Sequence, residues 1–389
     1  VNNSINFLVT FFTVEISVIL EEKGRSKSMY WQVIMENEEV ILFAAVLVAS
    51  LWLFIKRVYV ERLPSYFYCK YVFLTGCDSG FGRETALRLD SLGFNVFATC
   101  LTREGQADLT AMCSKRLKVI HLDVTDSQEI RNAYKFVEQS LPENTGLWGL
   151  INNAGIAKVG PIEWQTLDDY RQVADVNLWG LIDVTKVFLP LVKKQRGRII
   201  NISSIGGRAS LPHASAYSIS KFGVEAFSDA LRRELSPSGL KVSVIEPGFF
   251  RTNITSKDNL REQWNTLWNE LDGSLKEEYG GKYFQTSVKN MLKGMVDTCA
   301  SPHIYKVVDS IVHALTSPYP KSHYVVGWDA KLLWIWVSRF PAAIGDAILN
   351  LLGEKAEPSK CARANMPGDQ TTRKINENNN AMNGSVLHN

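Results

Sequence analysis

Two side chains four residues apart could carry out acid–base chemistry in this chain. Tyr217 and Lys221 occur in the segment Tyr-Ser-Ile-Ser-Lys, which opens a helical pattern that ends near Leu235. Residues four apart lie on one face of a helix, so the phenol and the ammonium group can approach the same small volume. A free tyrosine has a pKa of about 10, and a base that works near neutrality needs that pKa lowered to about 7. A neighbouring lysine ammonium lowers a tyrosine pKa in this direction.

A serine precedes this pair at the end of a predicted strand. Ser204 lies thirteen residues before Tyr217 and ends the run 200–204. Its hydroxyl could hold a substrate oxygen beside the phenol. A tyrosine and a lysine at this spacing are common by chance, so the pair is informative only together with Ser204 and a glycine-rich turn.

That turn follows the first predicted strand. The residues after Leu74 read Thr-Gly-Cys-Asp-Ser-Gly-Phe-Gly, with glycines at Gly76, Gly80 and Gly82, and a helical pattern begins at once. Glycine lets the backbone turn tightly and approach a pyrophosphate, whose charge is stabilised at a helix N-terminus. The spacing differs from the standard Gly-x-Gly-x-x-Gly fingerprint, but the position between strand and helix favours dinucleotide binding.

The end of the second predicted strand bears on the choice between NAD and NADP. An acidic residue there would bind the ribose 2′-hydroxyl of NAD, and an arginine would bind the 2′-phosphate of NADP. The run at this place is Thr-Cys-Leu-Thr-Arg and contains no acid. Arg103 either reaches a 2′-phosphate or is a solvated surface side chain, and Ser79 in the glycine turn is neutral. Both cofactors stay open on this basis, and we favour NAD.

Seven apolar runs alternate with helical patterns through the middle of the chain. Their continuous apolar character is typical of strands buried on both faces of a parallel sheet. Strands that alternate with helices predict right-handed βαβ units and a doubly wound α/β fold. We therefore predict a single such domain over residues 66–330. The predicted strands are residues 71–75, 95–101, 117–124, 147–154, 197–204, 241–247 and 323–328.

The composition excludes several classes of protein. The chain has 389 residues, with 43 Lys and Arg against 40 Asp and Glu, and 46% of it is hydrophobic. A disordered chain would be poorer in apolar residues, and a dedicated nucleic-acid binder would normally be strongly basic. Six cysteines show no Cys-x-x-Cys pair and no zinc-type spacing with histidine, so we predict no metal site. Cys77 and Cys100 are predicted to be buried thiols.

An uncharged segment near the start predicts a membrane anchor within residues 35–62. Residues 40–55 are sixteen residues without a charge. A helix of that length spans about 24 Å of a hydrocarbon core that is about 30 Å thick, and flanking residues can extend it. Lys56, Arg57 and Arg62 follow the segment, so the positive-inside rule places the bulk of the chain in the cytosol.

Four other segments differ from the predicted sheet domain. The chain opens at Val1, and we interpret residues 1–34 as an isoform or upstream extension outside the fold. Residues 249–307 are rich in aromatic residues and either line a deep apolar pocket or form the core of a capping helix pair. Residues 331–353 are apolar but interrupted by charges and a proline, which indicates a membrane-associated stretch or a lid. Residues 354–389 are polar and predicted to be disordered.

These motifs together resemble the short-chain dehydrogenase/reductase family over about residues 71–328. Further matching pieces are Asn-Asn-Ala-Gly at 152–155, Asn177, and Pro247-Gly248 followed by Thr252. Within the family, the glycine turn and the segments 220–235, 245–252 and 327–333 look like the membrane-bound retinol and hydroxysteroid dehydrogenases. D-β-hydroxybutyrate dehydrogenase is a relative with which they could be confused. The resemblance implies a Rossmann-like fold.

The resemblance also implies roles for individual residues. Tyr217 would be the general acid/base, assisted by Lys221, which would bind the nicotinamide ribose, and Ser204 would position the substrate oxygen. Asn177 would hold a water in a proton relay. In addition to Tyr217 and Lys221, the cofactor would contact Gly76, Ser79, Gly80, Phe81, Gly82, Asp123 at the adenine, Asn153 at the adenosine side, Ala154, Gly155, Pro247, Gly248, and Thr252 at the carboxamide.

The activity implied is reversible NAD(P)-dependent interconversion of a lipophilic alcohol, retinol or a hydroxysteroid, and its aldehyde or ketone. The alternatives are a 3-hydroxybutyrate dehydrogenase and a non-catalytic, cofactor-binding membrane scaffold. The apolar segment 249–307 and the anchor favour the first. The implied partners are a lipophilic substrate, a membrane and a second copy of the chain, with no nucleic acid. The implied location is the endoplasmic reticulum membrane with the catalytic domain in the cytosol; a lumenal orientation and a mitochondrial membrane are the alternatives.

Overall fold

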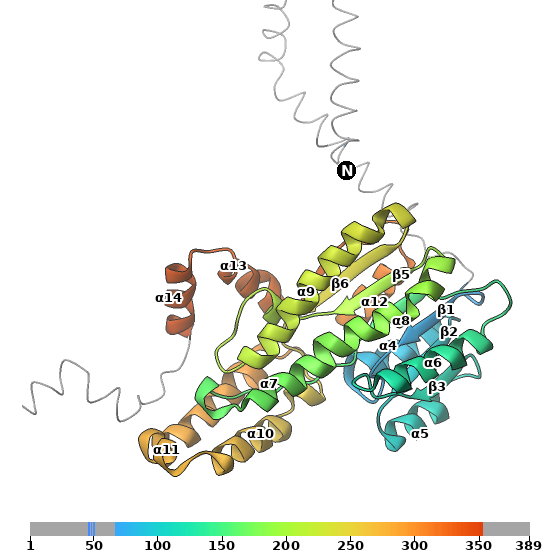
Figure 1. Ribbon diagram of the computed structural model, residues 1–389. Helices are drawn as coiled ribbons and strands as arrows, with labels where there is room; N and C mark the ends of the chain where they lie inside the picture. Colours follow the sequence, from blue (N-terminus) through green and yellow to red (C-terminus); the bar gives the residue numbers. More distant parts are fainter. Residues whose placement is uncertain (1–45, 47, 49, 51–66, 353–389) are drawn as a thin grey trace, which may run out of the picture. The chain divides into compact units, whose positions relative to one another are not determined.

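The computed structural model describes residues 46, 48, 50 and 67–352. Its centre is a seven-stranded parallel sheet in the order β3-β2-β1-β4-β5-β6-β7 (Figure 1). All seven predicted strands are confirmed, although most end up to three residues earlier than predicted because their last residues leave the sheet. The strands are β1 (Tyr71–Leu74), β2 (Asn95–Cys100), β3 (Leu117–His121), β4 (Gly149–Asn152), β5 (Arg198–Ile202), β6 (Lys241–Pro247) and β7 (His323–Val326).

Helices cover both faces of the sheet and form two cores. On one face, α4 (Gly80–Ser91), α5 (Arg103–Met112) and α12 (Tyr305–Thr316) pack against the strands. The other face is covered by α6 (Ser127–Ser140), α8 (Leu181–Lys194) and α9 (Ser215–Leu235). Apolar side chains therefore point from the strands into two separate layers, as continuous apolar runs require. Cys77 and Cys100 are buried, as predicted.

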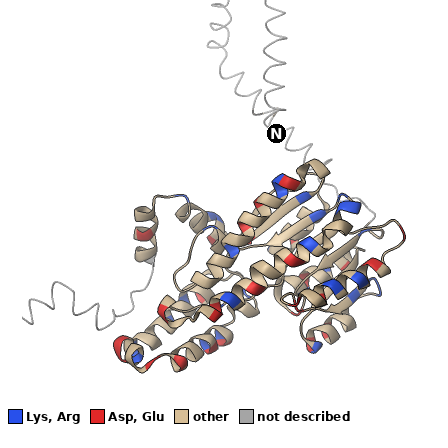
Figure 2. Ribbon diagram, viewed as in Figure 1, with Lys and Arg blue, Asp and Glu red and all other residues tan. Residues whose placement is uncertain are grey.

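Basic and acidic residues are interspersed along the outer helices rather than gathered on one of them (Figure 2).

A buried polar network fixes α9 over the sheet. Asn152 and Asn201 are paired neighbours on β4 and β5, and the Asn152 amide donates to Asn201 Oδ1 at 2.9 Å and to Thr185 Oγ1 at 2.8 Å. Asn201 donates in turn to Ser228 Oγ on α9 at 2.8 Å. Buried polar groups that are hydrogen-bonded in this way allow little sliding of the helices. The network therefore fixes the helix that carries Tyr217 and Lys221.

An aromatic cluster joins the capping helices α10 (Lys257–Glu270) and α11 (Gly273–Met291). Trp264 is fully buried, and its ring centre lies 5.5 Å from that of Trp164. Trp268 stacks on Phe284 at 4.9 Å between ring centres. Of the two interpretations of residues 249–307, these side chains support the core of a capping helix pair. The cluster also packs against Tyr217, so the cap lies beside the predicted acid/base.

The terminal segments fall mostly outside the described residues. The extension 1–34, nearly all of the predicted anchor in 35–62 and the tail 354–389 lie there; residues 46, 48 and 50 are helical. Among the helices that the structure does describe, none combines the length and apolar character needed to cross a bilayer.

The apolar segment that follows β7 is described up to residue 352. It forms a turn of π-helix (Ala330–Trp334), α13 (Ile335–Val337) and α14 (Ala342–Leu352). Several of its large apolar side chains are exposed, and Leu351 is 86% exposed.

Candidate active site

Two glycines of the turn between β1 and α4, Gly76 and Gly82, leave no room for a side chain. Gly76 has φ +69°, and a Cβ at Gly82 would lie 2.1 Å from the Gly76 carbonyl oxygen. The Asn153 side chain donates to the carbonyl oxygens of Thr75 and Gly76, both at 2.9 Å. Asn153 therefore holds the turn in shape from the adjacent strand β4. The family resemblance places Asn153 at the adenosine side of the cofactor, and the structure adds its two amide bonds to the turn.

The turn leads directly into the N-terminus of α4. Ser79 occupies the cap position, but its hydroxyl makes no capping hydrogen bond to the helix. The first N–H groups of a helix have no partner within the helix, and they attract negative charge. A glycine cradle followed by an N-terminus without a side-chain cap fits a pyrophosphate. The residues present thus fit a dinucleotide cofactor.

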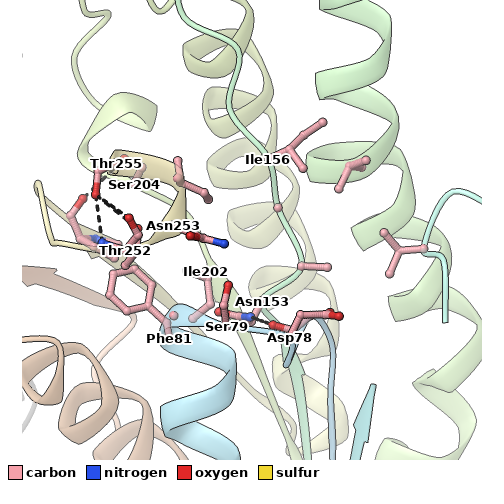
Figure 3. Close-up of a pocket in the computed structure, with 18 of the residues that line it drawn as sticks. Asp78, Ser79, Phe81, Asn153, Ile156, Ile202, Ser204, Thr252, Asn253 and Thr255 are labelled. Carbon is pink, nitrogen blue, oxygen red and sulfur yellow. Dashed lines mark hydrogen bonds between the residues drawn. The ribbon is translucent and has the colours of Figure 1, made fainter. Parts of the chain in front are cut away.

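A cleft of about 380 Å³ lies beside this turn, at the carboxyl ends of the strands (Figure 3). In open parallel sheets this edge is where ligands bind. Of the residues predicted to form the site, all but Gly82 and Asn177 line the cleft. The predicted residues in its wall are Gly76, Ser79, Gly80, Phe81, Asp123, Asn153, Ala154, Gly155, Ser204, Tyr217, Lys221, Pro247, Gly248 and Thr252.

Ser204, Tyr217 and Lys221 meet at one wall of the cleft. Ser204 follows β5, and its hydroxyl accepts a hydrogen bond from the Gly206 amide at 3.1 Å. Tyr217 and Lys221 lie in the first two turns of α9, and Lys221 Nζ lies 5.6 Å from the centre of the Tyr217 ring. Lys221 Nζ donates to the carbonyl oxygen of Ile202 on β5 at 2.9 Å. The predicted trio is therefore held together by one strand end and one helix.

The protein shifts the pKa values of the tyrosine and the lysine in opposite directions. Burial raises the pKa of Tyr217, and a hydrogen bond with Ser204 lowers it by a smaller amount. Burial lowers the pKa of Lys221 to about 8, against the opposing charge of Glu225. The protein's own groups thus raise the pKa of the phenol, opposite to the lowering that we expected. The reason is that desolvation of the phenolate outweighs the nearby hydrogen bond.

Asn177 lies behind the cleft rather than in its wall. It is fully buried in a π-helical turn (Asp175–Gly180). Its Oδ1 accepts from the Ile156 amide at 2.8 Å, and its Nδ2 donates to the Ile156 carbonyl at 2.9 Å and to Ser220 Oγ at 3.0 Å. Asn177 therefore ties the loop after β4 to α9. A Cβ at Gly155 would lie 3.2 Å from Asn177 Oδ1, so the glycine permits this close approach.

Asp123 and Thr252 occupy opposite sides of the cleft in local turns. Asp123 Oδ1 accepts from the amide and the hydroxyl of Thr125, at 2.8 and 2.7 Å. The amide of Thr252 donates to Thr255 Oγ1 at 3.0 Å, as drawn in Figure 3. Both predicted residues are thus held in place by neighbours two or three residues along the chain.

Sequence reasoning missed the role of Asp78 in the glycine turn. Asp78 Oδ2 accepts from the Leu101 amide at 2.9 Å, and its Oδ1 accepts from the amide and hydroxyl of Thr102 at 2.8 and 2.7 Å. A carboxylate therefore does lie at the end of β2, but it comes from the preceding turn. Asp78 lines the cleft, whereas Arg103 does not. The acid was visible between Gly76 and Gly80, but its pairing with β2 was not.

Apolar side chains that the sequence did not single out complete the wall. They include Ile156, Val176, Phe250 and Ile254. Phe250 and Ile254 belong to the segment 249–307, so part of that segment does line the cleft. Its tryptophans, Trp264 and Trp268, pack against Trp164 instead.

Comparison with known proteins agrees with this geometry. The family model described as short chain dehydrogenase matches residues 70–263. Retinol dehydrogenase 5 of Homo sapiens is 44% identical over 310 residues, which are 79% of this chain and 95% of that protein. Dehydrogenase/reductase SDR family member 9 of Homo sapiens is 46% identical over 291 residues, or 74% of this chain and 89% of that protein.

Among solved structures, a short-chain dehydrogenase from Streptomyces avermitilis superposes with a TM-score of 0.57 at 28% identity. The match covers 73% of this chain and 95% of that one. Fold, glycine turn and relatives together define the protein as an oxidoreductase built on a Rossmann-like sheet. The chain belongs to the short-chain dehydrogenase/reductase family, in the branch that contains the retinol dehydrogenases.

Proposed function

We propose that the protein interconverts a lipophilic alcohol, retinol or a hydroxysteroid, and its aldehyde or ketone. The proposal rests on one observation: Ser204, Tyr217 and Lys221 lie together in the wall of a cleft beside the glycine turn. The identity of 44% with a protein named as a retinol dehydrogenase supports the substrate class. Apolar side chains such as Phe250 and Ile254 in the wall suit a lipophilic molecule.

The positions of these residues indicate the role of each one in the reaction. A bound nicotinamide cofactor supplies the hydride chemistry. Ser204 holds the substrate oxygen, and Tyr217 Oη takes up or returns the hydroxyl proton. Lys221 lies beside the phenol and would bind the nicotinamide ribose, and burial lowers its pKa to about 8. Asn177 fixes the loop through Ile156 and would orient a water for proton exchange with solvent.

We propose NAD rather than NADP as the preferred cofactor. The residues that would hold it are Ser79 and Phe81 in the glycine turn, Asp123, Asn153 with the Ala154-Gly155 turn, Pro247-Gly248, and Thr252. Asp78 places a carboxylate at the end of β2, where it would repel a 2′-phosphate. Arg103, the residue that could have bound such a phosphate, does not line the cleft.

A substrate and cofactor panel tests the proposed function. Purified protein is given NAD or NADP with all-trans retinol, a 3α-hydroxysteroid, a 17β-hydroxysteroid or 3-hydroxybutyrate. We expect turnover of at least one lipophilic alcohol, with a higher kcat/KM for NAD than for NADP. Turnover of 3-hydroxybutyrate alone would support the small-substrate alternative. Tight cofactor binding without any turnover would support the scaffold alternative.

We also propose that the protein is anchored in the endoplasmic reticulum membrane by residues 35–62, with its catalytic domain, residues 66–330, in the cytosol. The segment after β7 supports contact with a bilayer, because Leu332, Trp336 and Ile344 expose 74%, 49% and 49% of their surface. Exposed aromatic and aliphatic groups of this kind suit a membrane interface. We expect the full chain to stay in the membrane pellet after alkaline carbonate extraction. Release into the supernatant would contradict an integral anchor.

A further inference from the structure

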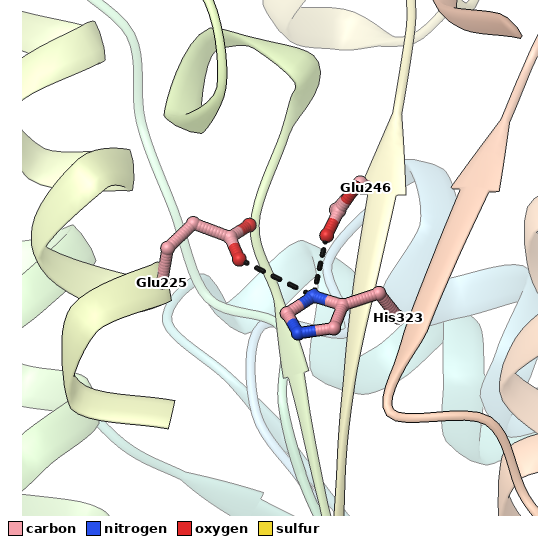
Figure 4. Close-up of side chains that lie close together, drawn as sticks. All are labelled: Glu225, Glu246 and His323. Carbon is pink, nitrogen blue, oxygen red and sulfur yellow. Dashed lines mark hydrogen bonds and ion pairs between the residues drawn. The ribbon is translucent and has the colours of Figure 1, made fainter. Parts of the chain in front are cut away.

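Four charged side chains gather next to the proposed catalytic residues without belonging to the cleft wall. Figure 4 shows Glu225 of α9 and Glu246 of β6 directed toward the ring of His323 on β7. His323 Nδ1 lies 2.6 Å from Glu246 Oε1, and Arg208 Nη2 lies 2.7 Å from the same oxygen. Glu246 is completely buried, and Glu225 is 8% exposed. We call these four residues the ionic cluster.

The ionic cluster connects three segments that build the active site. Arg208 ends the short helical turn that begins directly after Ser204. Glu225 follows Lys221 by one turn of α9, and the two residues after Glu246 line the cleft. Gly207 leaves no room between the loop and the helix, because a Cβ there would lie 3.0 Å from Glu225 Cγ. The distance between the serine and the tyrosine–lysine pair thus depends on how firmly the cluster holds together.

The charges of the ionic cluster balance only if it binds one additional proton. Arg208 contributes one positive charge, whereas Glu225 and Glu246 contribute two negative charges. The Glu225 carboxylate lies 3.6 Å from Arg208 Nη2 and 3.5 Å from His323 Nδ1, farther than a good hydrogen bond. A buried carboxylate with such distant partners favours its protonated form.

The pKa values of the cluster's groups shift in the directions that this charge count requires. Burial, together with the charge of Glu246, raises the pKa of Glu225 to about 7. A hydrogen bond with Glu246 raises the pKa of His323, against burial and against the charge of Arg208, whose Nη2 lies 2.7 Å from His323 Nδ1. Burial opposes the ionisation of Glu246, but hydrogen bonds from His323 and Arg208 lower its pKa. Glu225 and His323 are therefore the two groups that can share the additional proton.

The surrounding charges do not supply that proton. Asp229 faces His323 Nε2 at 3.3 Å and is paired with Arg232 at 3.0 Å and Arg233 at 2.9 Å. Lys221 lies one turn before Glu225 on the same helix. Its positive charge favours the ionised form of Glu225 and therefore does not raise the pKa of either glutamate. The oxygens of the two glutamates and a nitrogen of His323 lie within 4.8 Å of one another, as in a metal site. Arg208 already provides a positive charge between them.

We propose that Arg208, Glu225, Glu246 and His323 are positioning residues that hold the Ser204 loop against α9, and that the cluster loosens when it loses its shared proton. This inference rests on the proposed roles of Ser204, Tyr217 and Lys221. Without the proton, the buried carboxylates of Glu225 on α9 and Glu246 on β6 repel each other. The helix is then displaced from the strand and from Arg208 of the Ser204 loop, which is bound to Glu246 at 2.7 Å. Small displacements of catalytic groups lower kcat.

Glu225→Gln tests the proposal, because glutamine imitates the protonated acid at every pH. The matched control is Glu234→Gln, which removes the same charge from an exposed position on the same helix. The readout is the ratio of the wild-type kcat to the variant kcat between pH 6 and pH 9. Because the charge of Glu225 also raises the pKa of Lys221, this ratio is interpreted together with thermal unfolding, which does not depend on catalysis. We expect this ratio to fall about fivefold with rising pH for Glu225→Gln, or about 1 kcal/mol. It should stay constant for the control, with KM little changed in both.

Thermal unfolding gives a readout that does not depend on activity. Glu225 and His323 have raised pKa values in the folded protein, so their contribution to stability is lost as the pH rises through those values. For Glu225 this loss runs from its ordinary pKa of 4.5 up to about 7, so the wild-type Tm should decrease over that pH range relative to that of Glu225→Gln. If Glu225→Gln fails to fold, His323→Gln removes the other proton site and should flatten the same pH dependence.

A constant kcat ratio and parallel Tm curves would overturn the role of the ionic cluster. That result is distinguishable from failure of the proposed function, which would show as full turnover by Tyr217→Phe. Arg208→Lys compared with Arg208→Met completes the experiment. The lysine keeps the charge and should restore part of the kcat lost in the methionine variant; equal losses would argue against positioning by charge.

Discussion

Replacing Tyr217 by phenylalanine is expected to lower kcat by about a thousandfold or more, in the range of lost general acid–base catalysis. Phenylalanine keeps the ring that packs against the aromatic cluster and loses only the hydroxyl that exchanges a proton with the substrate. The cofactor cradle at the glycine turn is untouched. Cofactor affinity, measured by fluorescence titration with NADH, should therefore stay close to the wild-type value.

Tyr319→Phe is the matched control for this experiment. Tyr319 is 71% exposed and does not line the cleft, so removal of its hydroxyl should leave kcat unchanged. Steady-state rates of the alcohol found in the substrate panel give the comparison. Unchanged turnover by Tyr217→Phe would remove the assigned proton donor and, with it, the proposed mechanism.

Gly82→Ala is expected to weaken NAD binding by at least tenfold and to destabilise the fold. The new Cβ would lie 2.1 Å from the Gly76 carbonyl oxygen and 2.5 Å from Asn153 Nδ2. Backbone atoms cannot move aside as a flexible side chain can, so the whole turn must shift. Overpacking of this kind typically costs about 1–3 kcal/mol, and a loss of 1.4 kcal/mol in binding is about tenfold in Kd.

The same substitution at Gly281 provides the control. Gly281 is exposed on α11, and nothing lies within 4 Å of the position its Cβ would take. Gly281 directly follows the kink at Gly280, and alanine at this open position only restricts the unfolded chain, so Gly281→Ala should keep or raise Tm. Calorimetric titration with NAD and thermal melts report the two effects separately. Wild-type affinity and stability in Gly82→Ala would show that the turn does not form the cofactor cradle.

Local chemistry was enough to predict the sheet and its glycine turn. All seven strands were found from short apolar runs, because a strand buried on both faces must be apolar along its length. The helix that carries Tyr217 and Lys221 was found from spacing alone, and it runs from Ser215 to Leu235. Both signals lie within a few residues of the chain and need no knowledge of distant partners.

The aromatic residues of 249–307 show where local information stops. Their composition allowed either a lipid pocket or a packed cap, since both need large apolar side chains. The ring contact between Trp164 and Trp264 supports the packed cap rather than the lipid pocket for these aromatic residues. It joins two segments that lie a hundred residues apart in the chain. The spacing of apolar residues within either segment does not predict that contact.

Electrostatic properties were decided by the tertiary structure. Asp78 meets the end of β2 from the preceding turn, and Glu246 meets His323 from a strand 77 residues away. The pKa of Tyr217 is raised rather than lowered because burial, which depends on the whole fold, outweighs one hydrogen bond. The sequence by itself determined most of the residues that line the cleft, through strand, turn and helix signals of short range. Only the tertiary structure decided which charges face one another there, because that depends on contacts between distant segments.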